Sequence, residues 1–246
     1  MTEREEFLYK VIEAIAQTKS PIIFKGALIT KLLLRGSVNS IERETKDIDC
    51  DWIGEEVTME QLNLIISKAA STVGDFTVER FREFGEGRSA GFNIISKQGD
   101  KYASVDISIK DNPYYQVYKI GECEFRGSTV DKIVADKMLV VSCEKIFRRV
   151  KDVVDLYALS FCTSFRVNKV YEVLSNSNKL FGDFKMFLSE KEKIEHAYEK
   201  MNGIEKKPSF LEVYDRICIL IEPFLLKEID LVWSPSNGVW QKEDAG

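Results

Sequence analysis

The 246-residue chain has 44% hydrophobic and 30% charged residues and a net charge of −5, a composition typical of a soluble globular protein. The negative balance argues against a protein that coats nucleic acid through a general positive field. The single histidine, His196, argues equally against zinc sites built on several histidines and against catalysis by a histidine base. Chemistry on this chain is therefore expected to use carboxylates, lysines and a hard metal ion.

The cysteines and the apolar runs indicate the compartment. Five cysteines, an odd number without a Cys-x-x-Cys pair, predict buried free thiols rather than a disulfide framework or a zinc knuckle. No apolar run approaches the roughly 18 residues that span a bilayer, and the start MTEREEFLYK lacks the pattern of a signal peptide. We expect a cytoplasmic protein with no membrane-spanning segment.

The N-terminal part, residues 1–127, is predicted to be an α+β domain. A capping box of Thr2 and Glu5 and helically spaced apolar residues predict a helix from Thr2 to Gln17. A short apolar strand, a glycine turn at Gly26, a helix and a strand of alternating aspartates follow, and Thr58 opens a further helix. Alternation then predicts successive strands in FTVERFREF, GFNIISK, YASVDISI, QVYKI and ECEFR.

Residues 128–246 are predicted to form a helical domain, because the apolar period returns to helical spacing. Capping boxes are expected at Ser189 with Glu192 and at Ser209 with Glu212. The tail from Asp230 has no clear pattern. The predicted helices lie in STVDKIVADKMLVVSCEKIF, RRVKDVVDLYALSFC, RVNKVYEVLS, LSEKEKIEHAYEKM and SFLEVYDRICILIEPFLL.

Aspartates alternate in KDIDCDW, at Asp47, Asp49 and Asp51. A strand points these side chains to one face about 6.6 Å apart, where two unit charges repel by about 2 to 3 kcal/mol at an effective dielectric near 20. Water on a solvated edge strand or a bound cation can offset this repulsion. Another mid-strand aspartate, Asp106 in YASVDISI, is expected to share a face with Ser104; the alternative is an amphipathic strand with a wet face.

Two glycine motifs have different contexts. In FKGALITK a glycine turn joins a strand to a helix and offers backbone N–H groups to a phosphate beside Lys25; a tight strand–helix connection is the alternative. GEGRSAG imitates a dinucleotide-binding fingerprint at Gly85, Gly87 and Ala90, but no helix follows it. A hairpin turn is predicted there instead.

The ordered combination of these motifs resembles the nucleotidyltransferase superfamily related to DNA polymerase beta. More narrowly, FKGALITKLLL followed by RETKDIDCDW is similar to AbiEii-type nucleotidyltransferases, toxins of bacterial abortive-infection and toxin–antitoxin systems. SVDIS and VADKMLVVSCEKIFRRVKDVVDLYAL fit the same family. The resemblance covers residues 22–159. It implies an α+β fold, with a mixed β-sheet and flanking helices followed by a helical domain that completes the cleft.

The resemblance also implies site residues. Asp47, Asp49 and Asp106 would bind two Mg²⁺ or Mn²⁺ ions, with Asp106 helping to deprotonate the attacking hydroxyl. Asp51 has no counterpart in the family and is expected behind the metal ligands or facing solvent. The nucleotide-binding set would be Lys25, Gly26, Ala27, Thr45 and Lys137, and Lys137, Asp152 and Asp155 would complete the catalytic set.

Alternatives stay open for several of these residues. Ala27 replaces the family's second glycine, and a competing register uses Gly36 and Ser37 as the Gly-Ser pair. Taken singly, Lys137 is explained as well by a surface lysine, and the aspartates of KDVVD by a solvated helix face.

The predicted activity is transfer of a nucleoside monophosphate from an NTP to a hydroxyl on an RNA such as tRNA, on a protein or on a small molecule. Such transfer needs positioning and cationic stabilisation of phosphates, which suits a chain with one histidine. A toxin role would imply an antitoxin protein as partner. Two alternatives are a non-catalytic relative that binds nucleotide or a partner, and a transferase that modifies a small molecule such as an antibiotic.

Overall fold

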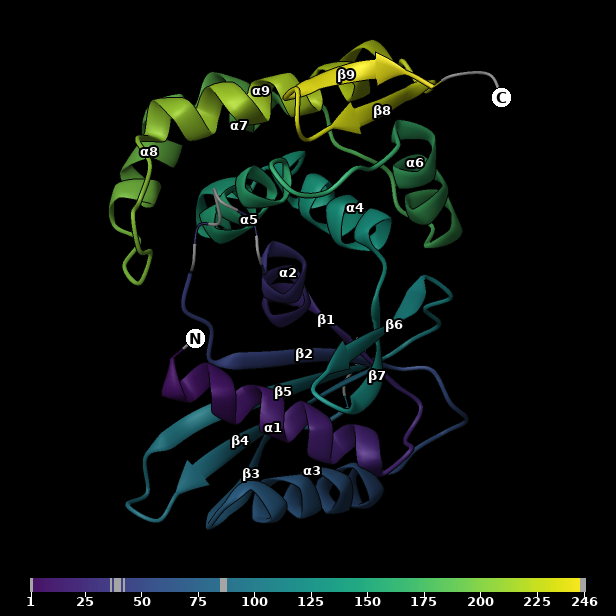
Figure 1. The fold of residues 1–246 in the computed structure, drawn as a ribbon, viewed down its shortest axis with the longest axis vertical. Coiled ribbons are helices and arrows are strands. Elements are labelled where there is room, and N and C mark those ends of the chain that lie inside the picture. Colours follow the sequence, from purple (N-terminus) through teal and green to yellow (C-terminus); the bar gives the residue numbers. More distant parts are fainter. Residues whose placement is uncertain (1, 36, 38–40, 42, 85–87, 244–246) are drawn as a thin grey trace. The chain divides into compact units, whose positions relative to one another are not determined.

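The computed structural model describes residues 2–35, 37, 41, 43–84 and 88–243 (Figure 1). The chain divides into two compact units, one formed by Met1–Ile29 and Glu44–Thr129, the other by Thr30–Arg43 and Val130–Gly246. Helix α2 (Gly26–Leu34) begins in the first unit and ends in the second. The second unit therefore includes a segment that precedes most of the first unit in sequence.

A mixed seven-stranded sheet forms the centre of the first unit, in the order β3-β4-β5-β2-β1-β7-β6. β2 pairs antiparallel with β1 and parallel with β5, whereas β1 and β7 are parallel and the other neighbours are antiparallel. The strands are β1 (Ile22–Lys25), β2 (Asp47–Trp52), β3 (Phe76–Arg82), β4 (Ser89–Ser96), β5 (Lys101–Ile109), β6 (Tyr115–Ile120) and β7 (Cys123–Ser128).

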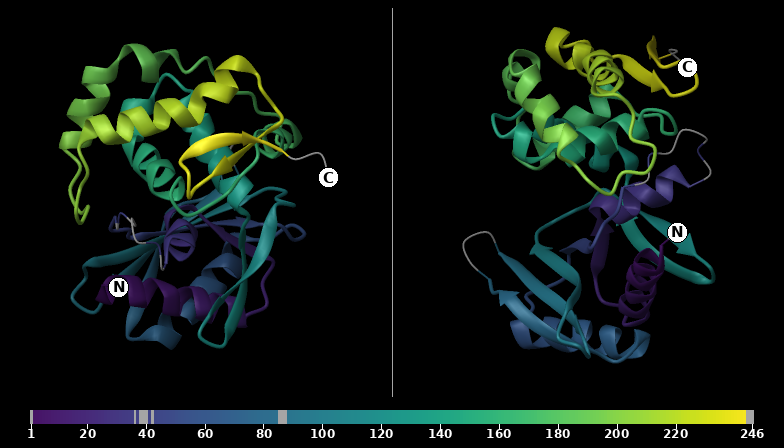
Figure 2. Two further views of the ribbon diagram at one scale, coloured as in Figure 1. Left: turned by 45° about the horizontal axis from the view of Figure 1, so that its top comes forward. Right: turned by 90° about the vertical axis from the view of Figure 1, so that its left-hand side faces the viewer.

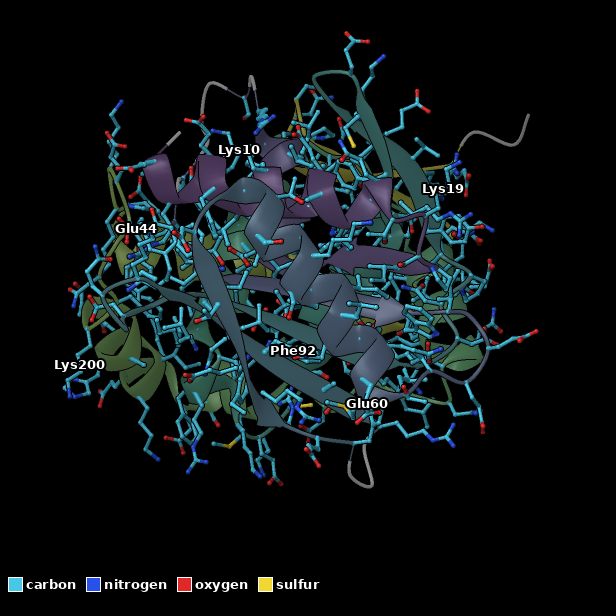
Figure 3. All side chains as sticks on the ribbon, turned by 90° about the horizontal axis from the view of Figure 1, so that it is seen from below. Lys10, Lys19, Glu44, Glu60, Phe92 and Lys200 are labelled. Carbon is cyan, nitrogen blue, oxygen red and sulfur yellow. The ribbon has the colours of Figure 1, made fainter. Side chains whose placement is uncertain are left out.

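Helices α1 (Glu3–Gln17) and α3 (Met59–Val73) pack against each other and against this sheet (Figures 1 and 3). Thr2 caps α1 in a capping box with Glu5, as predicted, and Thr58 caps α3 in the same way. Figure 3 views the sheet from the side of these helices and labels Phe92, whose side chain is fully buried. The core of the first unit includes the buried residues Leu8, Ile12, Ile15, Ile48, Leu62, Ile66, Phe92, Ile94 and Val105.

The second unit is mainly helical. Its helices pack chiefly through α4 with α5 and α6, and through α5 with α9. A 3₁₀ turn separates α4 from α5. The elements are α4 (Val130–Val141), the 3₁₀ turn (Ile146–Arg148), α5 (Val150–Leu159), α6 (Val167–Asn176), α7 (Lys185–Ser189), α8 (Lys191–Glu199), α9 (Phe210–Leu226), β8 (Leu231–Ser234) and β9 (Val239–Lys242).

One predicted helix start is wrong and one is confirmed. Ser209 caps α9 in a capping box with Glu212. Ser189, in contrast, is the last residue of α7, and its hydroxyl donates to the Lys185 carbonyl of that helix. Helix α8 begins only after Glu190, which makes no side-chain cap. Ser189 cannot cap α8 because it belongs to α7, a short helix that the sequence pattern does not predict.

The C-terminal tail forms a hairpin, β8–β9, beside α9 (Figure 2). Trp233 in β8 is 0% exposed, and its indole N–H donates to the Ser160 carbonyl at 2.7 Å. The Arg216 guanidinium lies 4.7 Å from the centre of the same ring. Trp240 in β9 donates to the Ile219 carbonyl of α9 at 2.9 Å. These contacts order a segment whose sequence pattern is not informative.

A mixed sheet with flanking helices, accompanied by a helical part, confirms the predicted α+β fold class. In the part of the chain that the structure describes, no helix is both long and apolar enough to cross a lipid bilayer.

Candidate active site

Strand pairing brings the predicted carboxylates together in the first unit. In the parallel pair β2–β5, Asp49 lies directly opposite Asp106, and Asp47 opposite Ser104. On the other side of β2, Lys25 of β1 lies opposite Asp49. Neighbouring strands are about 4.8 Å apart and paired residues share a face, so the three aspartates form one carboxylate face. The alternation of KDIDCDW is thus real strand geometry. Ile48 and Cys50, which alternate with the aspartates along the strand, are buried.

Two of these carboxylates are already bound by polar partners. The Ser104 hydroxyl donates to Asp47, and the Arg82 guanidinium donates to Asp106. Burial raises the pKa of the Asp106 carboxyl above its ordinary value; Arg82 opposes this effect and Asp47 adds to it. Asp106 is therefore a partly desolvated carboxylate beside another negative group, with an arginine as its counter-ion.

Gly26 lies against the Asp49 carboxylate. Its φ of +71° is in the left-handed region that favours glycine, and a Cβ there would be 2.5 Å from Asp49 Oδ2. Strand β1 ends at Lys25 and α2 starts at Gly26, so the predicted order of strand, glycine turn and helix is confirmed. Ala27 follows in the first turn of α2. Thr45 is buried just before β2, where its hydroxyl accepts from the Asp47 amide at 3.4 Å.

Asp51 is buried, which excludes the solvent-facing one of the two placements expected for it. Its side chain is 0% exposed and accepts a hydrogen bond from Asn112 at 2.9 Å. Lys25 forms an ion pair with it, and Lys110 approaches to 3.5 Å. Burial alone would lower the pKa of Lys25, but the charge and hydrogen bond of Asp51 outweigh it and raise that pKa. The ammonium group of Lys25 is thus held by Asp51.

The predicted residues of the helical unit also form one cluster. Lys137 of α4 contacts Asp155 at 2.6 Å and Asp152 at 3.4 Å, and the two aspartates lie one turn apart on α5. All three side chains are buried, so a surface lysine and a solvated helix face do not describe them. Arg43 donates to both oxygens of Asp155 at 3.2 Å, and Arg149 donates to Asp152 at 2.7 Å.

The surroundings of Asp155 in this cluster favour its ionised form. Burial alone would raise the pKa of Asp155, but the Lys137 and Arg43 charges and hydrogen bonds reverse the effect and lower it. The motif RETKDIDCDW includes Arg43 but does not indicate its contact with Asp155, and sequence analysis does not place Arg82 in the predicted site. The signal of Arg82 is weak, because it is one charge among several at the end of a strand.

The donor set of the carboxylate face suits a hard metal ion, because oxygen ligands are those that Mg²⁺ prefers. Over residues 2–35, 37, 41, 43–84 and 88–243, no group of three His, Cys, Asp or Glu side chains is yet arranged to hold an ion. One oxygen of Asp47 accepts a hydrogen bond from Ser104, and one oxygen of Asp106 accepts one from Arg82. The residues fit a metal in kind, because all three side chains offer carboxylate oxygens on one face of the sheet.

Two sequence predictions cannot be placed. The alternative register depends on Gly36, and the hairpin turn in GEGRSAG includes Gly85 and Gly87; these glycines lie outside the described residues.

A family model described as nucleotidyl transferase AbiEii toxin, type IV TA system, matches residues 7–216. The chain belongs to the AbiEii family. The match confirms the resemblance seen in the motifs and extends it beyond residue 159, through α6, α7 and α8 into α9. A search of curated proteins found no match.

Solved structures share the fold of this AbiEii protein. JHP933 from Helicobacter pylori has a TM-score of 0.56 and 14% identity, covering 93% of this chain and 96% of its own. MenT4, a nucleotidyltransferase toxin from Mycobacterium tuberculosis, has a TM-score of 0.57 and 14% identity, covering 92% of this chain and 84% of its own. At such identities the similarity shows the fold alone.

Proposed function

We propose that this AbiEii protein is a metal-dependent nucleotidyltransferase that moves a nucleoside monophosphate from an NTP to a hydroxyl acceptor. The observation that carries the proposal is the register of β2 with β5, which sets Asp49 directly opposite Asp106 with Asp47 on the same face. Membership of a nucleotidyltransferase family supports the reaction class.

Asp47, Asp49 and Asp106 would hold Mg²⁺ or Mn²⁺, with two ions expected. Bound there, the metal would neutralise the triphosphate charge and orient the nucleotide. This assignment leaves no role for a histidine, in keeping with the single His196 of the chain.

The nucleotide phosphates would be held mainly by backbone N–H groups at the start of α2, at Gly26 and Ala27. A helix start presents such groups with a favourable dipole, and Gly26 is already in the turn conformation beside Asp49. Asp51 holds the ammonium of Lys25. We therefore propose that Lys25 contributes a positive charge near the phosphates rather than a direct contact with them. Thr45 would keep the start of β2 in place.

The helical unit would contribute Lys137, Asp152 and Asp155. In their network the cations Arg43, Lys137 and Arg149 contact the carboxylates of Asp152 and Asp155. A group of several cations favours an anionic substrate. We therefore keep these residues as functional candidates in addition to their structural role.

The role as a toxin rests on the family, and it implies an antitoxin partner and a site of action in the cytoplasm, where NTPs are available. The acceptor is the remaining variable. RNA such as tRNA, a protein and a small molecule each offer a hydroxyl group for nucleotidyl transfer.

The proposal is tested by incubating the purified protein with each labelled NTP and with Mg²⁺ or Mn²⁺. Total tRNA, a protein mixture and small hydroxyl compounds serve as parallel acceptors. We expect label in one acceptor class, and none when EDTA removes the metal. If nucleotide binds but no acceptor is labelled under any condition, the protein is a non-catalytic binder and the proposal is wrong.

A further inference from the structure

A bulge in β3 brings Arg82 to the carboxylate face. Arg80 pairs with Phe92 of β4, but Arg82 pairs with Gly91, so the register shifts by one residue at Phe81. Gly91 in turn pairs with Asp106 of β5. Arg82, Gly91 and Asp106 therefore lie in one row across three neighbouring strands.

Gly91 leaves space for the Phe81 ring. A Cβ at this position would be 2.5 Å from Cζ of Phe81, so the ring lies against the glycine where a side chain would begin. The Arg82 guanidinium lies 5.7 Å from the centre of the same ring and donates to Oδ1 of Asp106. A larger residue at position 91 would displace the Phe81 ring beside this contact.

The contact is placed where a cation is needed and can be exchanged. Asp106 lies opposite Asp49 and near Asp47, so both the repulsion from these carboxylates and partial burial disfavour its negative charge. Arg82 offsets that charge. The two side chains are 45% and 29% exposed, and ion pairs this open to water are weak enough to be displaced.

We propose that Arg82 is a positioning residue that acts as the resident counter-ion of Asp106 and gives way when a metal ion binds. The inference rests on the proposed function, because it requires Asp106 to be a metal ligand. It accounts for a carboxylate face that has the right donors but is not yet arranged around an ion. Metal binding at this site is then an exchange of one cation for another.

The test measures Mn²⁺ binding to the full-length protein without nucleotide, by calorimetry and by the electron paramagnetic resonance signal of free Mn²⁺. We expect Arg82→Ala to bind Mn²⁺ about threefold to tenfold more tightly than the wild type, because the metal no longer displaces or repels a guanidinium. Arg82→Gln, which keeps a polar side chain but not its charge, should behave alike. The gain should shrink as salt is raised.

Arg80→Ala is the matched control. Arg80 lies in the same strand but forms its ion pairs with Glu60 and Glu83, at 3.9 and 3.5 Å, so its loss should leave Mn²⁺ affinity unchanged. If the wild type binds Mn²⁺ and both Arg82 variants, folded by circular dichroism, bind it no more tightly, the exchange is refuted and the metal site stands. If neither the wild type nor the variants bind Mn²⁺, the proposed function fails as well.

Discussion

Replacing Asp49 by asparagine should lower kcat/KM for nucleotidyl transfer by about a hundredfold to a thousandfold without unfolding the protein. Asparagine has nearly the same shape but lacks the anionic oxygen that a divalent ion prefers. Asp49 is central to the carboxylate face, with Lys25 opposite it on one side and Asp106 on the other. The measurement is steady-state transfer on the acceptor found for the wild type, with Mn²⁺ binding measured in parallel.

Asp75→Asn is the control for this experiment. Asp75 is an exposed aspartate in an ion pair with Lys97; both residues lie outside β2 and β5, and the loss of Asp75 should change neither transfer nor Mn²⁺ binding. A folded Asp49→Asn protein with wild-type activity would contradict the assignment of this residue to the metal. Lost transfer with retained Mn²⁺ binding would place Asp49 in the reaction but not among the ligands.

Replacing Asp51 by asparagine should lower the free energy of unfolding by about 3 to 5 kcal/mol, the usual cost of removing one partner from a buried ion pair. Asp51 is fully buried, and its loss leaves Lys25 without its counter-ion. Urea unfolding followed by circular dichroism measures the change. Because the folded-state pKa of Lys25 is raised, the stabilisation is complete at neutral pH and is lost as pH rises through that raised value.

A double replacement separates charge from packing. Asp51→Leu combined with Lys25→Met removes both charges and fills the same space with apolar side chains. The double replacement should therefore recover much of the stability that either single replacement loses. A loss below about 1 kcal/mol for Asp51→Asn would mean that the pair behaves as an exposed one. That result would contradict the buried counter-ion described above.

Local sequence patterns predict the parts of this site that depend on local geometry. The alternation of KDIDCDW is enough to place Asp47 and Asp49 on one face of a strand, and the glycine turn at Gly26 follows from its neighbours. Register between distant strands has no such local signal. Pairing of β2 with β5, and the contact of Arg82 with Asp106, depend on sheet order and on a bulge.

Burial is likewise decided by partners that lie far away in sequence. Asp51 looks like a continuation of the exposed alternation, yet Asn112, 61 residues later, donates to it in the interior. Arg43 contacts Asp155, 112 residues away. The same holds for the C-terminal tail. Trp233 is buried through contacts with Ser160 and Phe165 that the periodicity of the sequence does not predict.

The buried Trp233 also shows that the family match and the folding unit end at different residues. The family match ends at residue 216, inside α9, whereas the ring that closes the core of the helical unit comes 17 residues later (233 − 216 = 17). A protein shortened at the family boundary would lose this ring, leave the Ser160 carbonyl without its indole donor and expose Phe165 to water. Loss of a buried tryptophan typically costs about 3 to 5 kcal/mol, so the helical unit should be produced with the hairpin attached.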